Sequence, residues 1–144
     1  MWFVKDLKEW EEYEHKVLEI IRSDFLWETW EKNQDKKWVD LISSNWTTIE
    51  VKYDRQAQST WNVFIEVECN NSPSWIYKYD KIDYLAYTIP PYSYLVKVEE
   101  LKELISLWDY RTVKWGDWWR SKGVLIPLED YKTITIKTLK LWSI

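Results

Sequence analysis

The chain has 144 residues, a length that suits one domain with a real hydrophobic core, and we expect a single domain over residues 1–144. Its formal net charge of −4, from 24 acidic and 20 basic residues, argues against a protein that coats polyanions without specificity. The single cysteine, Cys69, excludes an internal disulfide and favours a reducing compartment, so we expect a cytoplasmic protein. No apolar run approaches 18 residues, and the N-terminal run is too short for a signal peptide, so we expect no membrane association.

An apolar stripe predicts a first helix over residues 6–22. Its members recur every three or four positions if position 14 is counted: Leu7, Trp10, Val17 and Ile21. Position 14 is Glu14, and a carboxylate inside an apolar stripe is costly unless it is paired. Two interpretations stay open. Glu14 lies at the edge of the stripe with its head in water, or it points at a sheet and joins a functional site there.

Strand patterns follow the helix. Residues 25–37 are polar, with room for a short strand and a loop. Further strands are expected over 39–42, 48–53, 62–68, 84–89, 92–98, 124–128 and 133–141. Short helices are expected over 77–83 and 99–108, and loops over 55–60, 70–75 and 114–122. This order predicts an α/β or α+β fold with a central mixed sheet flanked by helices.

The strand over 48–53 alternates between an apolar face and a charged face. Glu50 and Lys52 share the charged face, roughly 6 to 7 Å apart at their Cα atoms. If residues 39–42 pair with this strand in a hairpin around Ser44 and Asn45, Asp40 comes near Glu50. Two carboxylates and one lysine then converge, and such a group of side chains can hold a divalent metal that polarises a bound water.

This stretch resembles the PD-(D/E)XK nuclease superfamily, whose motif is an Asp, a hairpin turn and Glu-x-Lys on the next strand. Asp40, Glu50 and Lys52 match it, with Val39 in place of the frequent Pro. The later segments STWNVFIEVE and SPSWIYKYDKIDYLAY resemble a branch found in phage and mobile-element proteins, where they read approximately T-G-N-v-x-I-E and S-G-I…T-x-A-D-Y. The resemblance spans about two thirds of the chain.

The resemblance implies a restriction-endonuclease-like core and metal-dependent hydrolysis of nucleic acid, with DNA as the expected substrate, in a bacterial or phage-infected cell. Asp40 and Glu50, with the carbonyl of Val51, would hold Mg²⁺ or Mn²⁺. Lys52 would orient the attacking water or stabilise the transition state. Glu14 would help to position the metal, as a helix Glu does in many family members.

Four basic residues are candidates for phosphate contacts, although exposed basic side chains are usually only solvated: Lys78, Lys81, Arg120 and Lys122. Cleavage of a duplex would favour a homodimer. Two alternatives stay open: a binding module that keeps the fold without cleaving, and an unrelated α+β protein whose D…ExK pattern is accidental. One His and one Cys disfavour zinc chemistry.

The balance of tryptophan and glycine is abnormal. The chain has 13 Trp and 2 Gly, where average usage predicts about 10 Gly. Several Trp occupy expected turns, where glycine is favoured because φ is positive: Trp46, Trp61, Trp75, Trp118 and Trp119. Our hypothesis is that many of these codons are UGA, read as Trp here and as Gly in the source organism. The alternative is a Trp-rich protein that uses indoles for packing or base stacking. The turn Trp should have positive φ, unusual exposure or both, whereas Trp10 and Trp108 should pack on helices.

Overall fold

The structure is a computed structural model, and it describes residues 2–24, 29–33, 40–54, 56–78, 82–115 and 120–142. The helices and strands in these ranges are, in chain order, α1 (Trp2–Asp24), β1 (Trp30–Lys32), β2 (Leu41–Ser43), β3 (Thr48–Tyr53), α2 (Ala57–Thr60), β4 (Asn62–Cys69), β5 (Ser72–Pro73), α3 (Trp75–Lys78), β6 (Tyr84–Ile89), β7 (Tyr92–Lys97), α4 (Val98–Leu107), β8 (Thr112–Trp115), β9 (Ser121–Pro127), α5 (Leu128–Thr133) and β10 (Thr135–Lys140).

Six strands form a central sheet in the order β1-β2-β3-β6-β7-β10. The pair β3 and β6 is parallel and the other neighbours are antiparallel, so the predicted mixed central sheet of an α+β fold is confirmed. The remaining strands of the described residues form a second, antiparallel sheet in the order β5-β4-β9-β8, which the strand patterns in the sequence did not predict.

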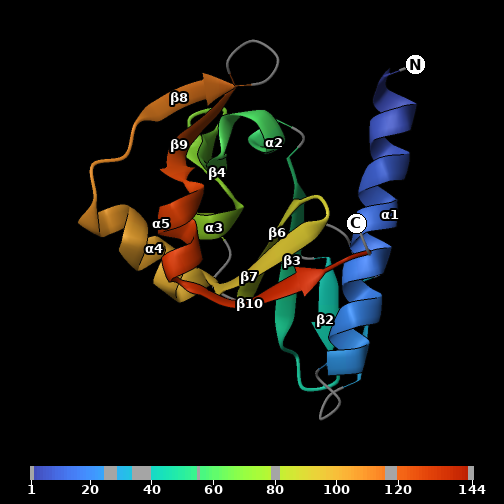
Figure 1. Ribbon diagram of the computed structural model, residues 1–144. Coiled ribbons are helices and arrows are strands. Elements are labelled where there is room, and N and C mark those ends of the chain that lie inside the picture. The colour runs from blue at the N-terminus through green and yellow to red at the C-terminus, as the bar shows by residue number, and fades with distance from the viewer. Residues whose placement is uncertain are drawn as a thin grey trace.

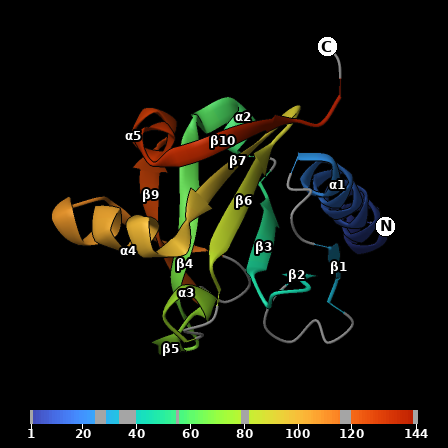
Figure 2. The same cartoon turned by 90° about the horizontal axis from the view of Figure 1, so that it is seen from below.

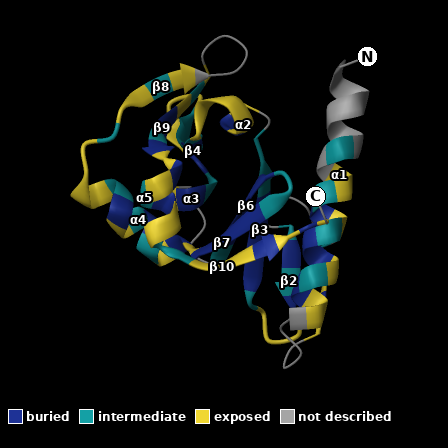
Figure 3. Ribbon diagram, in the orientation of Figure 1, coloured by how far each residue is buried: buried dark blue, intermediate teal, exposed yellow. Residues whose placement is uncertain are grey.

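The central sheet separates two hydrophobic cores. Figures 1 and 2 show α1 on one side of this sheet, and the second sheet with α4 and α5 on the other. Side chains alternate across a strand, so each central strand supplies both cores. On β3, Ile49 and Val51 pack with Val17 and Ile21 of α1. On β6 and β7, alternating residues pack with the second sheet, α4 and α5. Figure 3 shows both strands largely in the colour of buried residues.

The helix α1 extends the predicted helix by several residues at its N-terminus and two at its C-terminus. The C-terminal part of its apolar stripe is buried as expected, since Val17, Leu18 and Ile21 are at most 3% exposed. The side chains of Leu7 and Trp10 lie outside the described residues. Among the helices in the described ranges, none combines the length and apolar character that crossing a bilayer requires.

Three predicted segments are wrong in their element type. The loop predicted over 114–122 instead contains the end of β8 and the start of β9, which pair through Lys114 and Lys122. The polar connection over 55–60 contains the helical turn α2, and the loop predicted over 70–75 contains the short strand β5. The strand predicted over 133–141 is present as β10, which begins two residues later than expected. The error over residues 114–122 has a physical reason. The polar residues of this segment show no apolar alternation, so the sequence gives no sign that β8 and β9 pair there.

The backbone at two turn tryptophans matches the glycine-like expectation. Trp46 has φ 65° and Trp61 has φ 57°, and their side chains are 78% and 61% exposed, so the prediction is confirmed for both. It is wrong for Trp75, which begins α3 and packs half-buried against the larger core. The separate prediction that Trp108 packs on a helix is also wrong: α4 ends at Leu107, and Trp108 takes an extended backbone that leaves it 62% exposed. The side chains of Trp10, Trp118 and Trp119 lie outside the described residues.

Replacing Trp46 or Trp61 with glycine is expected to raise the free energy of unfolding by about 1 kcal/mol at each site, because a β-carbon at positive φ crowds the neighbouring carbonyl. Urea unfolding of Trp46→Gly and Trp61→Gly measures this effect. Trp108→Gly is the control, since Trp108 is equally exposed but has negative φ and should gain nothing. The coding DNA tests the recoding hypothesis separately: UGA codons at both positions are expected, and UGG codons would contradict it.

Candidate active site

The hairpin β2–β3 positions the first carboxylate. Leu41 pairs with Ile49 in the antiparallel register, so Asp40 lies opposite Glu50, one residue beyond the last paired position. The turn between the strands is closed by a hydrogen bond from the Trp46 N–H to the Ser43 carbonyl, at 3.0 Å. The expected approach of Asp40 to Glu50 through this hairpin is therefore confirmed.

The start of β3 is fixed from its other side by Asp83. The Asp83 carboxylate accepts the Thr48 N–H at 3.0 Å, and the Asp83 N–H donates to the Thr48 hydroxyl, also at 3.0 Å. These bonds join the first residue of β3 to the residue just before β6. Asp83 thus ties the start of the strand that bears Glu50 and Lys52 to the start of β6.

Asp40 lies beside the edge of β3, one residue before β2 begins at Leu41. Its Oδ2 accepts the Val51 N–H at 2.8 Å, and its carboxyl group also shares a side-chain hydrogen bond with Glu50. The N–H and C=O of a strand residue point to the same side of the strand, because paired residues exchange both bonds. The Val51 carbonyl is therefore directed toward Asp40 as well. Two carboxyl groups and one carbonyl meet at this edge.

Glu50 is an unusual carboxyl group, since it is only 8% exposed. Its pKa is raised to about 9, first by burial, then by the hydrogen bond with Asp40, and further by the charges of Asp40 and Glu14. Lys52 acts in the opposite direction, with its Nζ 4.0 Å from Glu50 Oε1. At neutral pH without a cation, Glu50 is therefore protonated and shares its proton with Asp40.

Lys52 lies between the carboxyl pair and solvent. Its side chain is 32% exposed, and its Nζ lies 5.6 Å from the centre of the Trp75 ring. That distance is within the range of a cation–π contact. The ammonium group therefore has a carboxyl group and an aromatic ring as neighbours while it remains accessible to a ligand.

Glu14 approaches the same end of the sheet from α1. It is only 4% exposed, so the interpretation in which its head reaches water is wrong. Its Oε2 lies 4.0 Å from Lys32 Nζ on β1, and its charge contributes to the raised pKa of Glu50. Glu14 thus faces the sheet and influences the carboxyl pair electrostatically.

The oxygen donors at this edge are of the kind that Mg²⁺ binds. Within the described ranges, no three His, Cys, Asp or Glu side chains are arranged to hold a metal ion. Mg²⁺ does not require such a cage, because it keeps several waters and is usually bound through one or two carboxylates. Asp40 and Glu50, with the carbonyl of Val51, offer that arrangement. A buried carboxyl with a pKa of about 9 is also a group whose ionised form a cation would stabilise.

A cavity of about 630 Å³ begins at Lys52 and extends between the end of β3 and the second sheet. Its apolar walls are Phe64, Ile65, Trp75, Tyr87, Val113 and Leu125. Its rim includes the exposed residues Gln56, Thr60 and Lys114, so the cavity opens to solvent. Asp40 and Glu50 do not line it, so Lys52 is the one motif residue that reaches this cavity. The carboxyl pair lies next to the cavity, and Lys52 connects the two.

Two acidic residues of this cavity were not identified as site residues from the sequence. Asp54 continues the charged face of β3, and its Oδ2 accepts the Tyr87 hydroxyl at 2.6 Å. Glu66 on β4 accepts hydrogen bonds from the hydroxyls of Ser74 and Ser121. The period-2 spacing from Glu50 through Lys52 could have identified Asp54, whereas the partners of Glu66 come from distant segments.

The phosphate-contact candidates are only partly described. Arg120 is exposed at the start of β9, and Lys122 Nζ lies 3.8 Å from Glu68 Oε2. They flank Ser121, which contacts Glu66 in the cavity. The side chain of Lys78 and all of Lys81 lie outside the described residues. Lys114, which pairs with Lys122 across β8 and β9, is a further basic residue on the cavity rim and was not among the candidates predicted from the sequence.

Comparison of the chain with models of protein families, with curated proteins and with solved structures finds no match.

Proposed function

We propose that the chain is a metal-dependent nuclease that hydrolyses phosphodiester bonds, with DNA as the expected substrate, in the manner of the PD-(D/E)XK superfamily that it resembles. One observation carries the proposal. The three motif residues converge at the end of one hairpin, where Asp40 bonds both Val51 and Glu50, and Lys52 lies 4.0 Å from Glu50. An accidental D…ExK pattern does not require a shared hydrogen bond between the two carboxyls or a lysine that opens on a cavity.

Each residue has a role that its position supports. Asp40, Glu50 and the Val51 carbonyl would hold Mg²⁺ or Mn²⁺, which when bound supplies a polarised water and neutralises phosphate charge. Lys52 would orient the water or stabilise the charge that develops on the phosphorane oxygens. Glu14, at 4% exposure, would keep the carboxyl cluster strongly negative and so favour the cation. Burial of Glu14 and Glu50 excludes bulk water, which strengthens these interactions.

Cleavage of a mixed DNA panel tests the proposal. Purified protein is incubated with single-stranded, duplex, nicked and branched oligonucleotides, in Mg²⁺, in Mn²⁺ and in EDTA. We expect metal-dependent cleavage of at least one substrate and none in EDTA. Binding without cleavage under every condition would instead identify a catalytically silent nucleic-acid-binding module on the same fold. If the protein neither binds nor cleaves any of these substrates, the D…ExK motif has a structural role only.

A further inference from the structure

The cavity beside Lys52 is large enough to hold a small organic group. At about 630 Å³ it lies within the roughly 300 to 1,000 Å³ that is usual for sites of small organic ligands. Neither Asp40 nor Glu50 lines it, so it is not the space in which these carboxyls meet a metal. Because Lys52 belongs to both places, a group held in the cavity lies directly beside the proposed position of the scissile phosphate.

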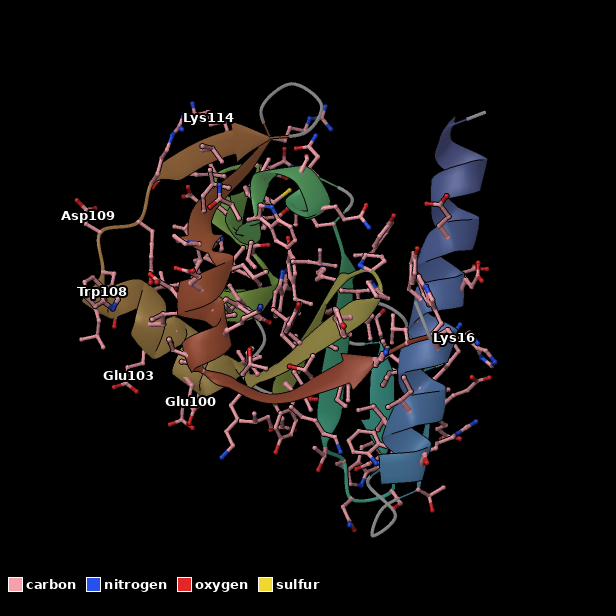
Figure 4. All side chains as sticks on the ribbon, viewed as in Figure 1. Lys16, Glu100, Glu103, Trp108, Asp109 and Lys114 are labelled. Atoms are coloured by element: carbon pink, nitrogen blue, oxygen red, sulfur yellow. The ribbon has the colours of Figure 1, made fainter. Side chains whose placement is uncertain are left out.

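The charges inside the cavity decide which part of a nucleotide it can accept. Asp54 and Glu66 line it, and both oxygens of each carboxylate accept hydrogen bonds from neighbouring protein groups. These fixed acidic groups would repel a phosphate that entered. The basic groups are Lys52, beside the carboxyl pair, and Lys114, on the exposed rim (Figure 4). A phosphate is therefore favoured at the mouth and an uncharged group inside.

The walls of the cavity suit a flat aromatic group. The Tyr87 ring is held in place, because its hydroxyl donates to Asp54 at 2.6 Å and accepts the Phe64 N–H at 3.1 Å. The Phe64 ring lies directly over Gly123, where an added β-carbon would be 2.3 Å from a ring carbon. Gly123 is thus required to let this ring lie against the sheet. The amide of Asn62 adds neutral hydrogen-bonding groups of the kind that read base edges.

We propose that this cavity binds one unstacked nucleobase of a nucleic acid whose phosphate lies at Lys52. The preferred substrate then contains an unpaired nucleotide at the cleavage site, as in a single strand, a loop or a branch point. A continuous duplex would first have to unpair and unstack that nucleotide, which costs free energy. This inference rests on the proposed function, because it places the phosphate at the proposed catalytic lysine.

Binding without cleavage tests the cavity. The full chain carrying Asp40→Asn, whose side-chain oxygen can still accept the Val51 N–H, is titrated in EDTA. The probes are a fluorescently labelled single-stranded oligonucleotide and the same sequence as a continuous duplex. We expect the single strand to bind more tightly. Adding Phe64→Leu should weaken single-strand binding about tenfold, which is typical for the loss of one base–aromatic stack, and should leave duplex binding unchanged.

A second cavity variant and a surface control keep the result interpretable. Leu125→Trp fills the cavity without removing apolar packing and should weaken single-strand binding to a similar extent. Trp108→Leu removes an exposed indole beyond the end of α4, on the outside of the molecule, and should change nothing (Figure 4). Thermal unfolding confirms that each variant is folded. If both folded cavity variants bind the single strand like Trp108→Leu, or if the duplex binds as tightly as the single strand, the inference is wrong.

The outcome of this binding test does not depend on whether the protein is a nuclease. Because the binding assay uses a metal-free, cleavage-silent background, a protein that never cleaves can still bind an unpaired base in the cavity. Conversely, wild-type protein that cleaves in Mg²⁺ but is indifferent to Phe64→Leu would retain the nuclease function and lose the base site.

Discussion

Replacing Lys52 with alanine should lower metal-dependent cleavage by a factor on the order of 10² to 10³, the usual cost of removing one preorganised electrostatic group. The fold should survive, because the Lys52 side chain is 32% exposed and belongs to neither hydrophobic core. Metal binding should remain nearly intact, since Asp40 and Glu50 are unchanged. The loss should appear in kcat more than in KM, because Lys52 acts on the transition state.

Lys102→Ala is a matched control for this experiment. Lys102 Nζ also lies 5.6 Å from the centre of an aromatic ring, that of Tyr77, but it belongs to α4 and has no place in the carboxyl cluster. Single-turnover cleavage and calorimetric Mg²⁺ titration are measured on both variants and on Asp40→Asn. Asp40→Asn should lose metal binding together with cleavage. Equal rates for Lys52→Ala and wild type would remove Lys52 from the mechanism.

The motif residues could be placed from the sequence because the information that places them is local. Period-2 alternation puts Glu50 and Lys52 on one face of a strand, and a short hairpin fixes the partner of that strand. The position of Asp40 then follows from the register. The parallel pairing of β3 with β6 was not predicted. It is a long-range pairing, and the bonds between Thr48 and Asp83 at its start join residues that lie 35 positions apart.

The cavity could not be predicted, because it depends on how two sheets meet. Its walls come from four strands (β4, β6, β8 and β9) and from α3, and the alternation within each strand gives no indication of a gap between them. Trp108 shows a related limit. Helical periodicity placed it on a packed stripe, but α4 ends one residue earlier and the side chain turns outward. A one-residue error in a helix end was enough to reverse the predicted burial of that residue.

Glu50→Gln should stabilise the metal-free protein above neutral pH and flatten the pH dependence of its stability. The Glu50 carboxyl has a pKa of about 9 in the folded protein, against 4.5 as its ordinary value. Between these limits the folded protein holds a proton that the unfolded chain releases. The contribution of Glu50 is therefore fully present below pH 4.5 and is lost as pH rises toward 9. The loss can reach about 1.4 kcal/mol per pH unit for a single group.

Glutamine keeps the size of Glu50 and a donor for the hydrogen bond with Asp40, but it cannot ionise. In EDTA, urea unfolding between pH 5.5 and 8.5 should therefore show wild-type stability falling with pH and Glu50→Gln stability staying nearly level. Glu68→Gln, on a carboxylate that is 41% exposed and paired with Lys122, should keep the wild-type slope. If the stability of Glu50→Gln falls with pH as steeply as that of the wild type, a group outside the carboxyl pair takes up the proton on folding. The carboxyl pair would then already be ionised without a metal, and the raised pKa would no longer support a cation site at Asp40 and Glu50.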